Sequence, residues 1–170
     1  LLFTGSVAIM LAQTVKADGI QVLQLGGWQA PYGISFVADM FAVILLIMTA
    51  FVSFCCLLYA FRTIGVQKEK HFVYPFFMFL ISGVNGSFLT GDIFNLFVCF
   101  ELMLMSSYAL ITLGGGKRQL RESIKYILLN VISSFFFLVA VAYLYAVTGT
   151  LNMADLSVRV SEIGQDGLLT

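Results

Sequence analysis

A single glutamate stands near the middle of a long apolar segment. The segment from Ile93 to Leu113 reads IFNLFVCFELMLMSSYALITL, and Glu101 is its one acidic residue. Keeping a carboxylate charged at the bilayer midplane costs about 3 kcal/mol on insertion scales. Protonating an ordinary glutamate, with a pKa of about 4.3, costs about 3.7 kcal/mol at pH 7. Because the two costs are similar, a glutamate placed here can take up and release a proton, and Glu101 is the main candidate for ion translocation.

The alternative is a structural carboxyl group that bonds to a hydroxyl or amide group of a neighbouring helix. Ser, Thr, Asn and Gln are the usual residues for such bonds, because they avoid the cost of ionisation, so a midplane glutamate favours the functional interpretation. Helical spacing is equally compatible with a partner helix or with lipid beside this residue. The residues that share its face are Phe94, Phe97, Val98, Leu104, Met105 and Tyr108.

Two other charged residues are weaker candidates for ion translocation. Lys125 lies a few residues inside the last apolar segment, where its long stem can reach the interface, so anchoring is favoured over a relay role. Asp39 lies near the end of another segment, where an interfacial carboxylate is the default and proton entry or exit is the alternative. Three small polar residues can bond across helices or hold water near the glutamate: Asn130, Ser133 and Ser134.

The composition indicates a membrane protein. Of 170 residues, 60% are hydrophobic and 11% are charged, and the mean hydropathy is +0.98. Soluble domains have about 25% charged residues, so these charges cannot cover a globular surface. A formal net charge of zero argues against nucleic-acid binding. The three cysteines lie in apolar runs without metal-ligand spacing, and His71 is the only histidine, so we expect no metal site, no catalytic triad and no cofactor.

Five apolar segments predict transmembrane helices. They cover residues 1–15, 37–61, 72–89, 93–113 and 124–147. All but the first are close to the roughly 20 residues that cross a hydrocarbon core about 30 Å thick. The ten-residue alternation of a β-barrel is absent, so the prediction is an all-α, polytopic transmembrane bundle that forms one membrane domain. Because the chain opens inside an apolar run, without Met or a basic region before it, we expect a piece of a longer chain rather than a signal peptide.

Basic residues predict the orientation of this bundle. They concentrate in every second connection between the segments, as the positive-inside rule requires. The basic residues of these connections are Arg62, Lys68 and Lys70, then Lys117, Arg118 and Arg121. The prediction places the loops 62–71 and 114–123 in the cytoplasm. Residues 16–33 and the tail 151–170 then face the outside.

Small residues in the 72–89 segment predict close helix packing. Residues 82–87 read SGVNGS, and small residues let two helix backbones approach each other. The glycosylation-like triplet Asn85-Gly86-Ser87 lies within this segment, so we discard it. The run Gly114–Lys117 lacks the first glycine and the hydroxyl residue of a phosphate loop, and we interpret it as a helix end and a turn.

Four stretches of the sequence, taken in order, resemble a known family. They are GGWQAPYGISFVADMFAVIL (26–45), GDIFNLFVCFELMLMSSYALI (91–111), KYILLN (125–130) and TGTLNMADL (148–156). They are similar to the antiporter-like membrane subunits that respiratory complex I shares with the multisubunit Mrp-type cation/proton antiporters, above all to the Mrp Na⁺/H⁺ antiporters of bacteria. The resemblance covers essentially the whole chain and joins several ordered motifs.

This resemblance implies a larger antiporter-like fold with inverted repeats in the bacterial plasma membrane. It implies that the glutamate of the FELML motif, Glu101 here, is essential for ion movement, with a lysine on a helix beyond Thr170 as its partner. The implied partners are other subunits of a hetero-oligomeric complex, the lipid bilayer, H⁺ and Na⁺, with Li⁺ or K⁺ as alternative cations, and no nucleic acid.

The predicted function is therefore that of a membrane subunit of a monovalent cation/proton antiporter, a secondary transporter rather than an enzyme. It would exchange cytoplasmic Na⁺ for external H⁺ and move protons through Glu101. Two alternatives stay open. One is a proton-pumping membrane subunit of an NADH-quinone oxidoreductase, and the other is a non-transporting assembly subunit in which the glutamate only holds helices together.

Overall fold

The computed structural model describes residues 1–65 and 72–169, with side chains described up to residue 162. Within these residues the chain forms six α-helices and one antiparallel pair of strands. The helices are α1 (Leu2–Asp18), α2 (Met40–Thr63), α4 (Val73–Leu89), α5 (Ile93–Thr112), α6 (Lys117–Thr148) and α7 (Met153–Leu169). The strands are β1 (Gln21–Gln24) and β2 (Ser35–Ala38), with the 3-10 turn η1 (Leu25–Gly27) following β1.

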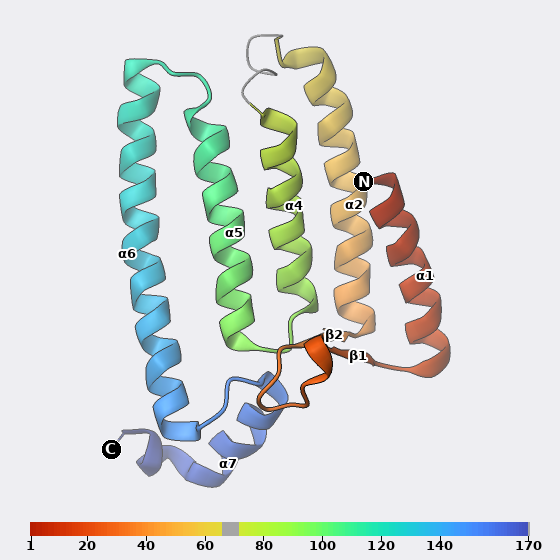
Figure 1. Cartoon of the computed structure of the whole chain (residues 1–170), viewed down its shortest axis with the longest axis vertical. Helices are drawn as coiled ribbons and strands as arrows, with labels where there is room; N and C mark the ends of the chain where they lie inside the picture. Colours follow the sequence, from red (N-terminus) through yellow and green to blue (C-terminus); the bar gives the residue numbers. More distant parts are fainter. Residues whose placement is uncertain (66–71, 170) are drawn as a thin grey trace.

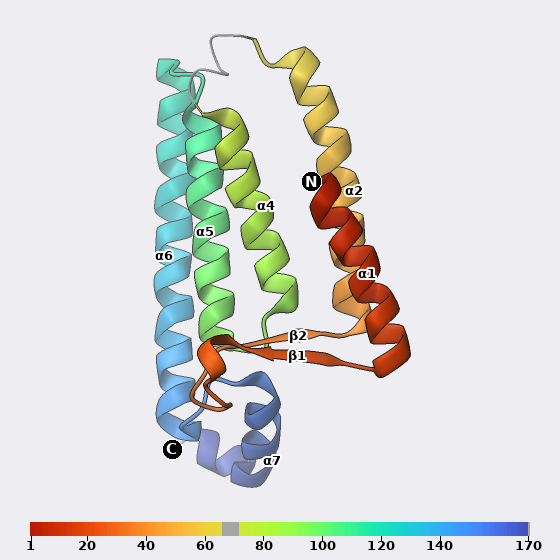
Figure 2. The same ribbon diagram turned by 45° about the vertical axis from the view of Figure 1, so that its right-hand side comes forward.

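The long helices stand side by side, and the hairpin lies at one end of them. Figure 1 shows α6, α5, α4, α2 and α1 following one another across the molecule. Figure 2 shows that α4, α5 and α6 form one group and that α1 and α2 form another, with β1 and β2 bridging the two groups. The hairpin and α7 share one end, which we call the hairpin end, and the α5–α6 turn lies at the opposite end.

The lengths and apolar composition of the helices match a membrane protein. Among the described residues, α2, α5 and α6 are long and apolar enough to span a bilayer, while α4 is a shorter apolar helix. Most large apolar side chains on the outer helix faces are exposed, such as Phe51 on α2 and Leu129 on α6. The hydrocarbon of a membrane, or apolar faces of neighbouring helices, can cover these side chains without exposing apolar surface to water. The predicted all-α, polytopic membrane fold is confirmed.

Three regions predicted as connections contain regular structure instead. The predicted loop 114–123 is a turn of four residues, because α6 already begins at Lys117, and its first turns consist of good helix formers. With 32 residues, or about 48 Å, α6 is longer than the hydrocarbon core. The region 16–33 contains β1, and the tail 151–170 contains α7. Part of the predicted loop 62–71, including Lys68, lies outside the described residues.

The small residues of α4 allow α5 to approach closely, as the sequence predicts. A methyl group added at Gly83 would lie 2.8 Å from the backbone oxygen of Cys99, and one added at Gly86 would lie 2.7 Å from Cys99 Sγ. Contacts this short leave no room for a side chain. Gly83 and Gly86 therefore form a packing surface against α5.

Backbone hydrogen bonds join three distant connections at the hairpin end. Gly91 N donates to Ser35 O (2.9 Å), and Met153 N donates to Gly91 O (2.9 Å). Ile93 N donates in turn to Leu151 O (2.9 Å). The short α4–α5 connection therefore lies between β2 and the α6–α7 connection. A side chain at Gly91 would meet Val37 and Ser35, so only glycine fits between them.

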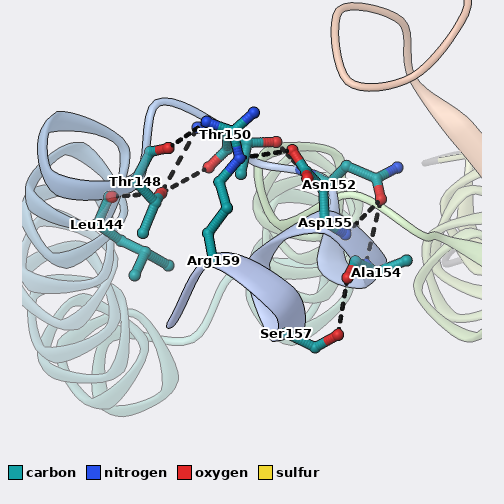
Figure 3. A network of polar contacts seen from close by, with 8 residues as sticks. All are labelled: Leu144, Thr148, Thr150, Asn152, Ala154, Asp155, Ser157 and Arg159. Carbon is teal, nitrogen blue, oxygen red and sulfur yellow. Dashed lines mark hydrogen bonds and ion pairs between the residues drawn. The ribbon is translucent and has the colours of Figure 1, made fainter. Parts of the chain in front are cut away.

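Buried polar side chains reinforce this junction, and we call them the polar latch. Its members are Ser35, Thr90, Asp92, Asn95, Thr148, Thr150 and Asn152, all at most 9% exposed. Asn152 Nδ2 donates to Ser35 Oγ (3.0 Å), across 117 residues of sequence. Asn152 Oδ1 accepts from the backbone N–H groups of Ala154 (3.1 Å) and Asp155 (3.3 Å), which caps the start of α7 (Figure 3).

Two Thr-Gly turns of the latch share a hydrogen-bond pattern between the threonine hydroxyl and the backbone two residues later. The Thr90 hydroxyl accepts from Asp92 N (3.3 Å) and donates to Asp92 O (3.1 Å). The Thr148 hydroxyl likewise accepts from Thr150 N (3.5 Å), but its single hydrogen points mainly to Leu144 O (2.7 Å), with Thr150 O farther away at 3.2 Å (Figure 3). Arg159 holds the second turn from α7, because its Nη1 donates to Thr148 O (2.9 Å). Both turns satisfy buried backbone groups that would otherwise be costly.

Gly83→Ala in the full-length protein should destabilise it by about 1 to 3 kcal/mol, because the new methyl group meets a backbone oxygen that cannot rotate away. Thermal unfolding of the purified complex in detergent measures this change. Gly65→Ala is the matched control, since among the described residues no atom lies within 4 Å of its added methyl group. Equal melting temperatures for the two variants would contradict the close approach of α4 and α5.

Asn152→Leu should destabilise the protein by about 2 to 4 kcal/mol, because it removes three hydrogen bonds and leaves buried partners unpaired. Ser157→Ala, which removes one exposed hydrogen bond on α7, should change stability by less than about 0.5 kcal/mol. Limited proteolysis near α7, read together with thermal unfolding, measures both. A tolerated Asn152→Leu would mean that the latch does not hold the hairpin end together.

Candidate functional site

The polar latch fixes where α5 begins and therefore how deep Glu101 lies. Asp92 caps the helix, since its Oδ1 accepts from Asn95 N (2.9 Å), and Asn95 Nδ2 donates to Thr90 Oγ1 (2.8 Å). Glu101 follows Ile93 by eight residues, which is about 12 Å along the helix axis. Because α5 has 20 residues, this glutamate lies near the middle of the helix.

Glu101 lines a cavity between α5 and α6 that is open at the surface of the two helices, where Ser133 is exposed. Its Oε1 is buried and has no hydrogen-bond partner among the described residues. The cavity has a volume of about 340 Å³. From α6 it is lined by Asn130, Ser133, Ser134 and Phe137, and the α5 side includes Phe97 and Leu104 beside the glutamate. The three small polar residues predicted to lie near Glu101 thus share its cavity.

Two aromatic pairs flank this cavity along the contact between the helices. The rings of Phe97 and Phe137 are stacked, with centroids 5.9 Å apart and planes at 11°. The rings of Tyr108 and Tyr126 meet edge to face, with centroids 5.8 Å apart. The phenylalanines lie toward the hairpin end and the tyrosines toward the opposite end, as their positions along α5 and α6 require. Glu101 therefore lies in a segment bounded by aromatic contacts.

The face predicted for Glu101 divides into two parts. Phe97, Leu104 and Tyr108 lie toward α6, as the cavity and the ring contacts show. The remaining members, Val98 and Met105 among them, are exposed, with Met105 at 66%. The helix α6 thus covers one side of Glu101. Helical spacing alone could not distinguish between a partner helix and lipid at this residue.

Lys125 lies away from the cavity. Its Nζ is 2.9 Å from Glu122 Oε2, and both side chains are more than half exposed. A pair of this kind contributes little to stability because water screens it. The position agrees with the favoured anchoring role, and a relay role for Lys125 stays a prediction.

Asp39 has a structural task in the fold. Its Oδ1 accepts from Ala42 N (2.7 Å) and caps the first turn of α2. It does not line the cavity of Glu101. A part in proton entry or exit stays a prediction for this residue. Of the three candidates, only Glu101 lies in a cavity with other polar groups of the membrane-spanning helices.

The polar latch is the element that sequence reasoning missed. Its signal is the repeated Thr-Gly pair, at 90–91 and at 148–149, each directly after an apolar segment. Both pairs fall within or beside stretches quoted for the family resemblance, but their pairing across the fold follows from no local pattern.

Comparison with known proteins supplies a family and close relatives. The model of the family described as NADH:quinone oxidoreductase/Mrp antiporter, TM, matches residues 90–168. The chain is 58% identical over 163 residues to a subunit of the Na(+)/H(+) antiporter of Alkalihalophilus pseudofirmus, an alignment that covers 96% of this chain and 33% of that protein. The chain thus spans about a third of the length of this curated relative.

Two solved structures contain a similar arrangement. A chain of the membrane-bound sulfane sulfur reductase, an archaeal respiratory membrane complex, superposes with a TM-score of 0.91 at 36% identity, over 98% of this chain and 34% of that chain. A chain of the Mrp complex from Dietzia sp. DQ12-45-1b superposes with a TM-score of 0.79 at 30% identity, over 92% of this chain and 32% of that chain.

Two substitutions distinguish the helix-capping role of Asp39 from a role of its charge. Asp39→Ala removes the acceptor for Ala42 N and should destabilise the full-length protein by about 1 kcal/mol, whereas Asp39→Asn keeps a cap and should leave stability nearly unchanged. Thermal unfolding of the purified complex measures both. If Asp39→Asn is stable but ion transport is lost, the charge has a function that the cap does not explain.

Proposed function

Since this chain belongs to the antiporter-like membrane subunits that NADH:quinone oxidoreductases and Mrp antiporters share, we propose that it acts in a membrane subunit of a multisubunit Na⁺/H⁺ antiporter. The observation that carries this proposal is the mid-helix carboxyl oxygen of Glu101, which is buried and unpartnered among the described residues. A transported proton needs such a group within the bilayer, where it can be bound and released. The substrates are H⁺ and Na⁺, and the partners are the other subunits of the complex.

Glu101 serves as the protonatable group of this transport. Its carboxylate pays a desolvation cost of about 3 kcal/mol at mid-membrane, which is close to the cost of protonating an ordinary glutamate at neutral pH. A modest change in the surroundings is therefore enough to change its protonation state. A cation that approaches the cavity favours the carboxylate, and its departure favours the protonated form. The lysine implied by the family resemblance is one such cation.

The orientation of the subunit follows from its basic residues. Lys117, Arg118 and Arg121 lie in the first turns of α6, at the end opposite the hairpin. The positive-inside rule assigns this end to the cytoplasm. The hairpin, the polar latch and α7 then face the outside.

A proton-pumping subunit of a respiratory complex is the second candidate. The similarity to a chain of an archaeal respiratory complex, at 36% identity, favours it. Transport that stops when sodium is removed supports the antiporter. Transport that depends on NADH supports the respiratory pump.

Glu101→Gln in the full-length subunit should abolish Na⁺-dependent proton movement, with activity reduced at least about 100-fold, because glutamine cannot take up and release a proton. The measurement is ΔpH formation in everted membrane vesicles, alongside the amount of assembled complex. Glu122→Gln is the matched control, since Glu122 is exposed and pairs only with Lys125 among the described residues.

The outcome also tests the assembly alternative. Normal transport by Glu101→Gln would show that this residue is not a proton relay. Loss of assembled complex, with normal transport by the complexes that remain, would identify Glu101 as a structural carboxyl group.

A further inference from the structure

We propose that the outer face of α6 binds a phospholipid with an anionic headgroup. Seven exposed residues form this face, which we call the α6 stripe: Arg118, Arg121, Lys125, Leu128, Ile132, Phe135 and Val139. The headgroup lies at the three basic residues, and an acyl chain lies along the four apolar residues that follow them. This inference goes beyond the proposed function and does not depend on the role of Glu101.

Helical spacing places the seven residues on one side of α6. Along the chain they follow one another in steps of three and four residues, which is the repeat of a single helix face. The four apolar members are each at least 50% exposed. Ser123 and Val141, on the opposite side, are only 2% and 6% exposed. Because α6 stands at one end of the row of helices (Figure 1), the stripe is an outer face of the described fold.

The basic end of the stripe carries more positive charge than its own helix balances. Lys125 Nζ lies 2.9 Å from Glu122 Oε2, whereas Arg118 and Arg121 form no ion pair within the part of the chain that the structure describes. The first turn of α6 contains no acidic residue, and Lys117 adds a further cation beside Arg118. The N-terminal end of a helix favours negative charge, so these cations do not stabilise their own helix. The phosphate group of a lipid supplies the anion that they lack.

The apolar end of the stripe has the length of one membrane leaflet. From Leu128 to Val139 the helix rises by eleven residues, or about 16 Å. Half of a hydrocarbon core about 30 Å thick is about 15 Å. Lys125 precedes Leu128 by about one turn, and its long stem lets the ammonium group reach the interface. The stripe therefore meets a headgroup and an acyl chain in the order in which one leaflet presents them.

The side chains of the stripe favour lipid over another helix as the occupant. Helix contacts within membranes are enriched in small residues, which let two backbones approach closely. The contact of α4 with α5 is of this kind, at Gly83 and Gly86. The stripe instead contains branched and aromatic side chains and no small residue. A helix on this face would also have to place carboxylates beside Arg118 and Arg121, whereas an anionic lipid brings the charge and the apolar chain in one molecule.

Quenching by brominated lipids tests the proposal in the full-length subunit within its complex. The native cysteines are replaced by alanine, the Ile132→Cys thiol is labelled with bimane, and the complex is reconstituted in phosphatidylcholine. Phosphatidylglycerol with brominated chains should quench this label with an apparent affinity at least about 10-fold higher than brominated phosphatidylcholine. The reason is that each cation at a membrane surface favours anionic lipid by a factor of about 5, and two unpaired arginines lie at this site.

Charge variants show whether the basic end selects the lipid. The double variant Arg118→Gln, Arg121→Gln should lower the preference for phosphatidylglycerol at least about 5-fold, whereas Arg118→Lys, Arg121→Lys keeps both charges and should retain it. Arg62→Gln removes a cation at the same end of the bundle, on α2, and is the matched control that should leave the preference unchanged. Glu122→Gln should raise the preference, because it releases Lys125 from its ion pair.

Equal quenching by the two lipids would overturn the proposal, as would a preference that survives in the Arg118→Gln, Arg121→Gln variant. If neither lipid quenches the label, protein covers the stripe, and the proposal is wrong. None of these results changes the expected inactivity of Glu101→Gln, so the proposed function is tested separately.

Discussion

A carboxyl group inside a membrane needs either partners for its charge or a proton that neutralises it. This constraint connects most features of the structure. Glu101 lies halfway along α5 with a buried oxygen that no described residue contacts by a hydrogen bond. At the bilayer midplane, the cost of a charge and the cost of protonating an ordinary glutamate at pH 7 are similar. The surroundings of Glu101 include a cavity with small polar residues from α6.

The depth of this carboxyl group depends on the hairpin end. Asp92 both caps α5 and belongs to the polar latch, so the helix that carries Glu101 starts at a fixed point. The latch joins β2, the α4–α5 connection and the α6–α7 connection through buried side chains and backbone bonds. The two helices that form the cavity are thereby held in register at one end. At the opposite end they are joined by a short turn with Gly115 in a left-handed conformation.

Sequence alone predicts the apolar helices and the central glutamate, because both follow from local composition, whereas the less apolar α7 was expected as a tail. Long apolar segments can only be helices in lipid, and a lone midplane glutamate is costly enough to indicate function. The close packing at Gly83 and Gly86 was also predictable, since small residues allow two helix backbones to approach each other. The hairpin and the latch could not be predicted. Asn152 and Ser35 are far apart in sequence and are joined by a single hydrogen bond between their side chains. The caps and surface pairs of Asp39 and Lys125 likewise became visible only with their neighbours in place.

The most direct test of the account is the protonation of Glu101 itself. Infrared difference spectroscopy of the assembled complex in lipid, recorded between alkaline and mildly acidic pH, reports the carbonyl stretch of protonated carboxyl groups. The account predicts a band that gains intensity as the pH falls, lies at the frequency of a buried carboxylic acid and is absent from the Glu101→Gln complex. A spectrum in which Glu101 keeps one protonation state across this range would contradict it.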